Sequence, residues 1–257
     1  MRMGQVSVTA QRVAARRLTF PRVPGPYGDP EADQRLGRDI AGPVVLVDPY
    51  SPMTVHLAAR TAYFDRATVR ALDGGITQVV VAGAGYDGRA LRYAKPGVRW
   101  FEIDHPATQA DKVARLARLA ISAPQLTFVA ADFATADVGA ALAGAGHDRA
   151  MPSLFLCEGV AVYLDLDLAV IVSLLRALRS GAAPGSRLAI SVSAATTDER
   201  RRKFQSAVCA LGEPLRTILT AEAASELLAS SGWQELPSPP ERRARSVQAG
   251  FLSLEPV

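Results

Sequence analysis

The residues whose types and spacing best suit chemistry are three glycines followed, about twenty residues later, by an acid. Gly83, Gly85 and Gly88 directly follow the apolar run 79–81 and fit the pattern G-x-G-x-x-G. Glycine lets a chain leaving a buried strand turn sharply and lets a ligand approach its backbone. Asp104 ends the next strand-like run, where a carboxylate binds ribose hydroxyls in nucleotide-binding α/β domains. The spacing predicts a site for a nucleoside-containing cofactor.

Asp87 favours one kind of cofactor over another. It lies in the loop that would have to hold a pyrophosphate, and a carboxylate there repels phosphate charge. S-adenosylmethionine has no phosphate and carries a cationic amino-acid tail. A nicotinamide-dependent short-chain oxidoreductase would also need a tyrosine with a lysine four residues later, and the six tyrosines of the chain have none. The sequence therefore favours S-adenosylmethionine over NAD(P).

Strand-like and helix-like runs alternate around this loop, which predicts a doubly wound α/β fold with a mostly parallel sheet. The prolines and glycine of segment 21–30 are expected to break any regular element there. Two late strand candidates have no helix between them, so they should pair antiparallel, as in class I methyltransferases. The expected strands are 79–81, 98–103, 126–131, 153–157, 186–192, 233–236 and 249–254. The expected helices are 7–18, 53–72, 106–121, 135–144, 165–179, 197–211 and 220–230.

Composition limits the class of protein. The 257 residues are 49% hydrophobic without a long unbroken apolar run, which predicts a soluble globular protein with no membrane partner. The net charge of +4 comes from scattered arginines without interleaved aromatics, so no nucleic-acid partner is expected. Cys157 and Cys209 match no metal or redox spacing, and no signal peptide is evident. We expect no metal site and a cytoplasmic location.

Motifs in matching order along most of the chain show a resemblance to a known family. They include Arg60-Thr61-x-x-Phe64-Asp65, Gly83-Ala84-Gly85-Tyr86-Asp87-x-Arg89, Phe101-Glu102-Ile103-Asp104-His105-Pro106, Ala131-Asp132 and Glu158-Gly159-Val160-x-x-Tyr163-Leu164. In these the chain resembles the leucine carboxyl methyltransferase-like family of S-adenosylmethionine-dependent O-methyltransferases, in its bacterial small-molecule branch. The resemblance implies a Rossmann-like seven-stranded sheet with the last strand antiparallel. It also implies a helical cap (1–72) on a cofactor-binding core (73–257), with a second cap segment at 194–218.

The resemblance also implies roles for individual residues around S-adenosylmethionine. Arg60, with help from Arg17, would bind its carboxylate, while Asp104 would bind the ribose and Glu158 would face the ammonium. The loop residues Gly83, Ala84, Gly85 and Asp87 would pass beneath the methionine portion, and Asp132 and Phe133 would frame the adenine. Tyr163 is a weak catalytic candidate, and no residue stands out as a general base.

Each role has a structural alternative. Arg60 could pair with Asp65 or Glu31, Asp104 and Asp132 could be solvated loop acids, and Glu158 could be buried and paired. Tyr163 and Trp233 suit a hydrophobic core.

The expected reaction is methyl transfer to a carboxylate or hydroxyl of a small molecule, such as a secondary metabolite. Relatives that methylate a protein C-terminus use an arginine after an Asp-Leu pair, whereas this chain has Asp132-Phe133-Ala134. A protein acceptor is therefore disfavoured. The alternatives are an NAD(P)-dependent oxidoreductase and a non-catalytic scaffold that binds the cofactor. The oligomeric state is open, a homodimer included.

Overall fold

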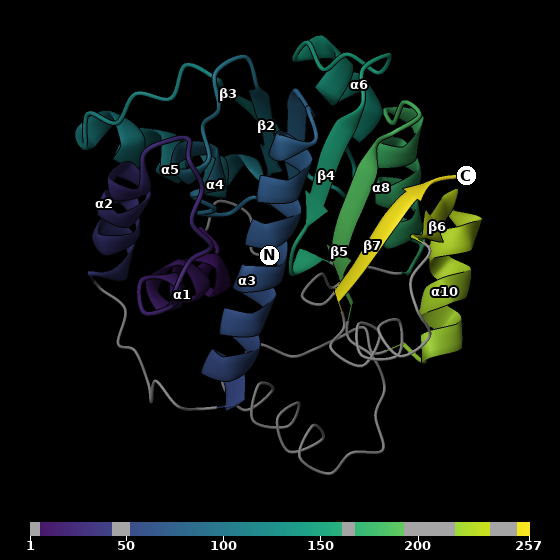
Figure 1. The fold of residues 1–257 in the computed structure, drawn as a ribbon, viewed down its shortest axis with the longest axis horizontal. Helices are drawn as coiled ribbons and strands as arrows, with labels where there is room; N and C mark the ends of the chain where they lie inside the picture. The colour runs from purple at the N-terminus through teal and green to yellow at the C-terminus, as the bar shows by residue number, and fades with distance from the viewer. Residues whose placement is uncertain (1–5, 43–51, 161–167, 193–218, 237–250) are drawn as a thin grey trace. The chain divides into compact units, whose positions relative to one another are not determined.

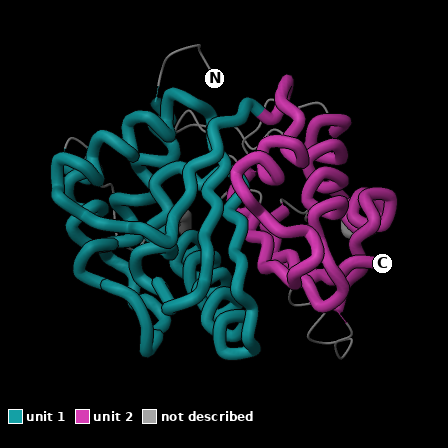
Figure 2. The backbone as a smooth tube through the Cα atoms, turned by 90° about the horizontal axis from the view of Figure 1, so that it is seen from above, with its two compact units in different colours: residues 1–132 teal, residues 133–257 magenta. Residues whose placement is uncertain are grey.

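The computed structural model describes residues 6–42, 52–160, 168–192, 219–236 and 251–257. The chain divides into two compact units, Met1–Asp132 and Phe133–Val257, which Figure 2 colours separately. The predicted cap, residues 1–72, falls within the first unit, and its boundary stays a prediction. No helix in the described ranges is long and apolar enough to span a membrane.

Seven strands form a mixed sheet in the order β3-β2-β1-β4-β5-β7-β6 (Figure 1). They are β1 (Gln78–Ala82), β2 (Arg99–Asp104), β3 (Leu126–Ala130), β4 (Ser153–Cys157), β5 (Arg187–Ser191), β6 (Trp233–Glu235) and β7 (Phe251–Pro256). The first five strands were expected as parallel strands and the last two as an antiparallel pair. The predicted fold class is confirmed.

In the first unit the parallel strands bring three loops to one edge. β1 pairs with β2, and β2 pairs with β3. Ala82 lies opposite Ile103, and Asp104 lies opposite Ala130, so these strands end at the same level. All five residues of β1 are buried, as expected for a strand covered on both faces. The glycine loop after β1 and the acid that ends β2 are therefore neighbours.

Five helices lie in the described part of this unit. They are α1 (Val8–Arg17), α2 (Pro30–Ala41), α3 (Pro52–Asp73), α4 (Arg89–Arg92) and α5 (Pro106–Arg118). The predicted helix start at Ser7 is confirmed, because its hydroxyl accepts a hydrogen bond from the Ala10 amide at 3.1 Å. The expectation that Pro30 would break regular structure is wrong. Asp29 caps α2, and Pro30 takes its first position, where the missing N–H costs no hydrogen bond.

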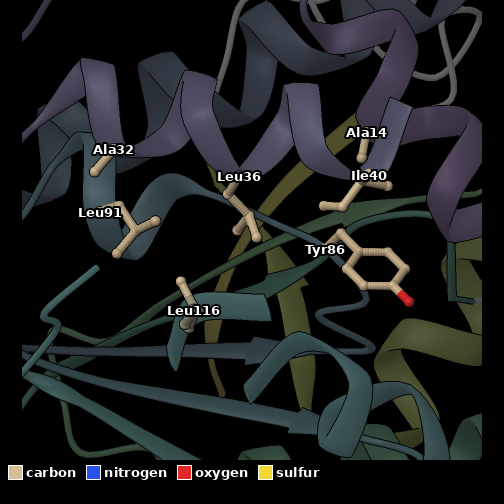
Figure 3. Packing of buried hydrophobic residues seen from close by; sticks show 7 residues of the cluster. All are labelled: Ala14, Ala32, Leu36, Ile40, Tyr86, Leu91 and Leu116. Carbon is tan, nitrogen blue, oxygen red and sulfur yellow. The ribbon is translucent and has the colours of Figure 1, made fainter. Parts of the chain in front are cut away.

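A hydrophobic cluster joins the two N-terminal helices to the elements that follow β1 and β2. Figure 3 shows Leu36 and Ile40 of α2 pointing toward Leu116 of α5 and toward the ring of Tyr86 in the glycine loop. The complete cluster of buried residues is Ala14, Ala32, Leu36, Ile40, Tyr86, Leu91 and Leu116. Burial of this apolar surface fixes α1 and α2 against the loop that is expected to hold the cofactor.

The second unit combines parallel and antiparallel pairing. The helices in its described ranges are α6 (Val138–Gly144), α8 (Leu168–Ser180) and α10 (Ala221–Ser230). β4 and β5 are parallel, whereas β7 is antiparallel to both β5 and β6. Trp233 is fully buried, and its Nε1 donates to the Leu175 carbonyl at 3.0 Å, so its prediction as a core aromatic is confirmed. The helix predicted at 197–211 lies outside the described residues.

Candidate cofactor site

The turn after β1 has the backbone conformation that only glycine adopts readily. Gly83 and Gly85 have φ values of +65° and +51°. The amides of Gly83 and Ala84 both donate to the Ile103 carbonyl, at 2.8 and 3.1 Å, which ties the turn to the end of β2. A Cβ added to Gly85 would lie 2.9 Å from the Cβ of Ala10 in α1. The turn is thus hydrogen-bonded to the end of β2 and packed closely against α1.

Asp104 stands at the end of β2 with its carboxylate directed at this turn. One carboxylate oxygen accepts from the Gly85 amide at 2.5 Å, and the other accepts from the His105 amide at 2.7 Å. Burial raises the pKa of Asp104, and the two amide hydrogen bonds oppose that rise. A carboxylate has about four acceptor positions. Two therefore remain for the vicinal hydroxyls of a ribose, so this geometry fits a nucleoside.

Asp87 makes ion pairs within the protein. Its carboxylate accepts from the Arg89 amide at 2.8 Å and from the Arg89 guanidinium at 2.5 Å, and the Arg17 guanidinium lies 3.6 Å away. The side chain is 4% exposed. A carboxylate repels a pyrophosphate only when its charge is unbalanced, whereas the charge of Asp87 is compensated by arginine. The predicted role of Asp87 toward the cofactor stays a prediction.

Asp65, the last residue of the Arg-Thr-x-x-Phe-Asp motif in α3, supports the loop that follows the glycine turn. Asp65 is fully buried, and its carboxylate binds Arg89 at 2.8 Å and Arg22 at 2.7 Å. Burial alone would raise the pKa of Asp65, but the two guanidiniums outweigh it and lower the pKa to about 2. Asp65 thus joins α3 to the loop that follows the glycine turn.

A buried lysine supports the same loop from α5. The Lys112 ammonium donates to the Asp87 carbonyl at 2.6 Å and to the Glu102 carboxylate at 2.5 Å. The other carboxylate oxygen of Glu102 has no hydrogen-bond partner in the described part of the chain. Burial raises the pKa of Glu102 to about 7, although the ammonium of Lys112 acts in the opposite direction. The pair holds the backbone of the glycine loop from inside the fold.

Four further predicted site residues lie in the described ranges. Arg60 is buried in α3, and Asp132 is exposed just after β3. Phe133 and Glu158 belong to the second unit, where both are half-buried. Tyr163 and the proposed cap segment 194–218 lie outside the described residues.

Two basic residues of the site, Arg16 and Lys112, were not predicted from the sequence. Arg16 is 8% exposed, and its Nε has no hydrogen-bond partner within the described ranges. A buried guanidinium is costly unless an anion binds it, so Arg16 is suited to a ligand carboxylate. Lys112 was the second. The scarcity of lysine could have drawn attention to it, since Lys95, Lys112 and Lys203 are the only three in the chain.

Comparison with known proteins identifies the family. The sequence profile described as leucine carboxyl methyltransferase matches residues 47–177. A predicted S-adenosyl-L-methionine-dependent methyltransferase of Mycobacterium tuberculosis is 32% identical over 219 residues, which cover 80% of this chain and 71% of the relative. This chain therefore belongs to the leucine carboxyl methyltransferase family.

Other relatives are longer than this chain. A predicted S-adenosyl-L-methionine-dependent methyltransferase of Streptomyces coelicolor is 35% identical over 194 residues, 74% of this chain and 62% of the relative. A similar protein of Frankia alni is 33% identical, over 70% of this chain and 59% of its own length. The match thus spans about three-fifths of each of these two relatives.

Solved structures support the fold. A DUF574-family protein of Streptomyces avermitilis has a TM-score of 0.60 at 16% identity, and the match covers 99% of both chains. Magnesium protoporphyrin IX methyltransferase of Synechocystis, solved with bound SAH, has a TM-score of 0.54 at 14% identity. That match covers 86% of this chain and 93% of the other.

Proposed function

We propose that this protein is an S-adenosylmethionine-dependent O-methyltransferase that acts on a carboxylate or hydroxyl of a small molecule, such as a secondary metabolite. Family membership supports the cofactor. The main structural support for a cofactor site is the hydrogen bond from the Gly85 amide to the Asp104 carboxylate, which joins the glycine turn to the acid proposed to bind ribose. Asp104 would bind the ribose, and the backbone of 83–85 would lie beneath the methionine portion.

Three arginines of the first unit have a side chain that suits the cofactor's carboxylate. Arg60 and Arg17 were predicted for this role, and the buried Arg16 adds a third guanidinium. Arginine offers a fork of N–H donors that matches a carboxylate. Asp132 and Phe133 would contact the adenine, and Glu158 would face the ammonium. Ala84 and Asp87 complete the loop.

The bound cofactor would supply an electrophilic methyl group on a sulfonium. The protein's own contribution is then to bind and orient the two reactants, which can account for much of a rate enhancement. A carboxylate acceptor is ionised at pH 7 and needs no base. A hydroxyl acceptor would benefit from one, and Tyr163 remains a weak candidate. We expect catalysis to depend mainly on positioning, with Tyr163 and the segments 17–30 and 194–218 lining or covering the acceptor.

The proposal extends to partners and location. A small acceptor is expected rather than a nucleic acid or membrane, because the arginines are scattered along the sequence and no nucleic-acid-binding motif is evident. The buried Cys157 is a free thiol, which suits the reducing cytoplasm.

Calorimetric titration with S-adenosylmethionine, S-adenosylhomocysteine and NADPH tests the cofactor directly. We expect micromolar binding of the first two and none of the third. Asp104→Asn keeps the side-chain size but removes the charge, and should weaken S-adenosylhomocysteine binding at least tenfold. Asp137→Asn, which alters an exposed helix cap in the second unit, is the matched control. Binding of NADPH alone, or equal affinities of wild type and Asp104→Asn, would reject this site.

A further inference from the structure

A buried acid, Glu102, lies on β2 two residues before Asp104, the acid proposed to bind ribose. Side chains alternate along a strand, so these two acids belong to the same face of the sheet. The Glu102 side chain is 2% exposed, and its partners in register on β1 and β3, Val81 and Phe128, are apolar. One of its carboxylate oxygens has no hydrogen-bond partner in the described part of the chain. Ionised Glu102 is therefore only half compensated.

The charged side chains that act on Glu102 come from α5, from the glycine loop and from β2 itself. The Lys112 ammonium of α5 donates to its carboxylate at 2.5 Å and attracts its negative charge. Asp87 of the glycine loop and Asp104 of β2 are acids, and both repel that charge. The same ammonium also acts on Asp104, where it opposes the rise in pKa that burial causes. Two acids of β2 thus share the field of one ammonium.

The balance of these effects leaves Glu102 ready to titrate near neutral pH. Burial raises the pKa of Glu102 to about 7, Lys112 opposes the rise, and the two neighbouring acids add to it. A group at its midpoint changes its proton occupancy most when its surroundings change. Binding of a ligand at Asp104 changes the surroundings of Glu102 directly, because the two acids repel each other.

We propose that Glu102 is a proton-binding site coupled to the cofactor site, and that it takes up a proton from solvent when the cofactor binds. The inference rests on the proposed function, in which Asp104 binds the ribose. Ribose hydroxyls donate to a carboxylate and so favour the ionised form of Asp104. The ribose also displaces water from Asp104, which strengthens the repulsion between the two acids. Both effects favour protonated Glu102.

The coupling makes cofactor affinity depend on pH. Proton binding and cofactor binding strengthen each other by the same factor. Because Glu102 holds its proton more tightly in the complex, affinity should be highest below pH 7 and should fall as pH rises through the interval between the free and bound pKa values. Neutral Glu102 competes less for the Lys112 ammonium, which also donates to the Asp87 carbonyl at 2.6 Å. The proton thus favours the contact that supports the glycine loop.

Calorimetric titration of the full chain with S-adenosylhomocysteine measures the proton uptake. The titration is run at pH 7.5 in HEPES and in Tris, which have different ionisation enthalpies, so a proton taken from the buffer changes the observed heat. If cofactor binding raises the proton affinity of Glu102 about tenfold, uptake should be about half a proton, and Kd should rise about fourfold from pH 6.5 to pH 8. Absence of uptake in the wild type would refute the proposal, whatever the variants do.

Glu102→Gln assigns the proton to its site. Glutamine has the shape of protonated glutamate and still offers an oxygen to Lys112. The variant should bind S-adenosylhomocysteine as the wild type does at pH 6.5, take up no proton and keep the same Kd at pH 8. Glu226→Gln, at an exposed position of α10, is the matched control and should retain the uptake. Uptake retained in Glu102→Gln would assign the proton to another group, such as His105 beside Asp104, and would reject the proposal.

The same titrations separate this inference from the proposed function. Absence of S-adenosylhomocysteine binding at every pH would reject both. Binding of S-adenosylhomocysteine with equal heats in the two buffers would leave the proposed function intact and reject the proton site alone.

Discussion

Replacing Lys112 by methionine should destabilise the protein strongly and in a pH-dependent way. The ammonium is 2% exposed and binds both the Glu102 carboxylate, at 2.5 Å, and the Asp87 carbonyl, at 2.6 Å. Methionine keeps much of the side-chain length but donates no hydrogen bond. The substitution therefore leaves a buried acid and a buried carbonyl without their shared donor. Removing one partner of a buried ion pair costs about 3–5 kcal/mol.

The protonation state of Glu102 determines how much stability Lys112→Met loses within the range of about 3–5 kcal/mol. Burial already raises its pKa from an ordinary 4.5 to about 7 with the ammonium present, and loss of the ammonium must raise the pKa further. At pH 7 the variant can therefore keep Glu102 neutral. The remaining loss is the charged hydrogen bond to the carbonyl and part of the Glu102 interaction. We expect about 3 kcal/mol at pH 7.

The pH dependence follows from the direction of the Glu102 shift. A carboxyl with a raised folded-state pKa keeps a proton that the unfolded chain releases, so stability falls as pH rises through the interval between the two pKa values. In the wild type this interval runs from about 4.5 to about 7. In Lys112→Met it extends above 7. The variant should lose about a further 1 kcal/mol for each pH unit above 7, where the contribution of Glu102 to the wild type is nearly constant.

Urea unfolding at pH 6, 7 and 8 measures these differences, with a second substitution as the decisive test. The double variant Lys112→Met with Glu102→Leu removes both charges, and replacing a whole buried pair by apolar groups is often nearly neutral. It should be more stable than Lys112→Met alone. Lys95→Met is the control, because it removes another lysine–carbonyl bond, of 2.7 Å. Additive effects of the two substitutions, or equal pH profiles for both lysine variants, would refute the reasoning.

Asp65→Asn should cost about 3–5 kcal/mol in urea unfolding, because it leaves two buried guanidiniums without their carboxylate. Arginines lower the Asp65 pKa to about 2, so its stabilising contribution is present above its ordinary pKa near 4 and should be lost as pH falls toward 2. Gly85→Ala places a Cβ 2.9 Å from Ala10 at a residue with positive φ, so it should lower the free energy of unfolding by about 1–3 kcal/mol and weaken S-adenosylhomocysteine binding. Gly97→Ala is the control, because Gly97 also has a positive φ but an added Cβ would have no atom within 4 Å. It should cost less stability and leave binding intact. Trp233→Phe should cost about 1–3 kcal/mol by calorimetry, because a carbonyl of α8 loses its buried donor.

Local sequence signals predicted most of the fold. Buried strands such as 153–157 are compact apolar runs, and helix caps such as Ser7 lie directly before their helices. The error at Pro30 was also local. Proline breaks a helix in its interior but is well placed at its first position, and Asp29 immediately before Pro30 and Glu31 after it are typical of a helix start.

The ion pairs could not be predicted in this way because their partners are distant in sequence. Arg22 and Asp65 are 43 residues apart, and Arg92 and Asp33 are 59 residues apart. Charge pattern within one helix can indicate a pair at i and i+4, but no such rule covers side chains that only the tertiary fold brings together. Asp87 shows the consequence. Its charge was assigned to the ligand because the arginines around it were not known.

Motif residues in this chain therefore support the cofactor loop as well as suiting a ligand. Asp65, Asp87 and Arg89 belong to the motifs that indicate the family, and Arg89 pairs with both acids inside the first unit. Gly85 and Asp104, by contrast, face each other where the strands end, and the acid keeps acceptor positions for a ligand. Substitution of the first group should change stability and cofactor binding together. Substitution of Asp104 should change binding with little loss of stability, because burial already disfavours its charge.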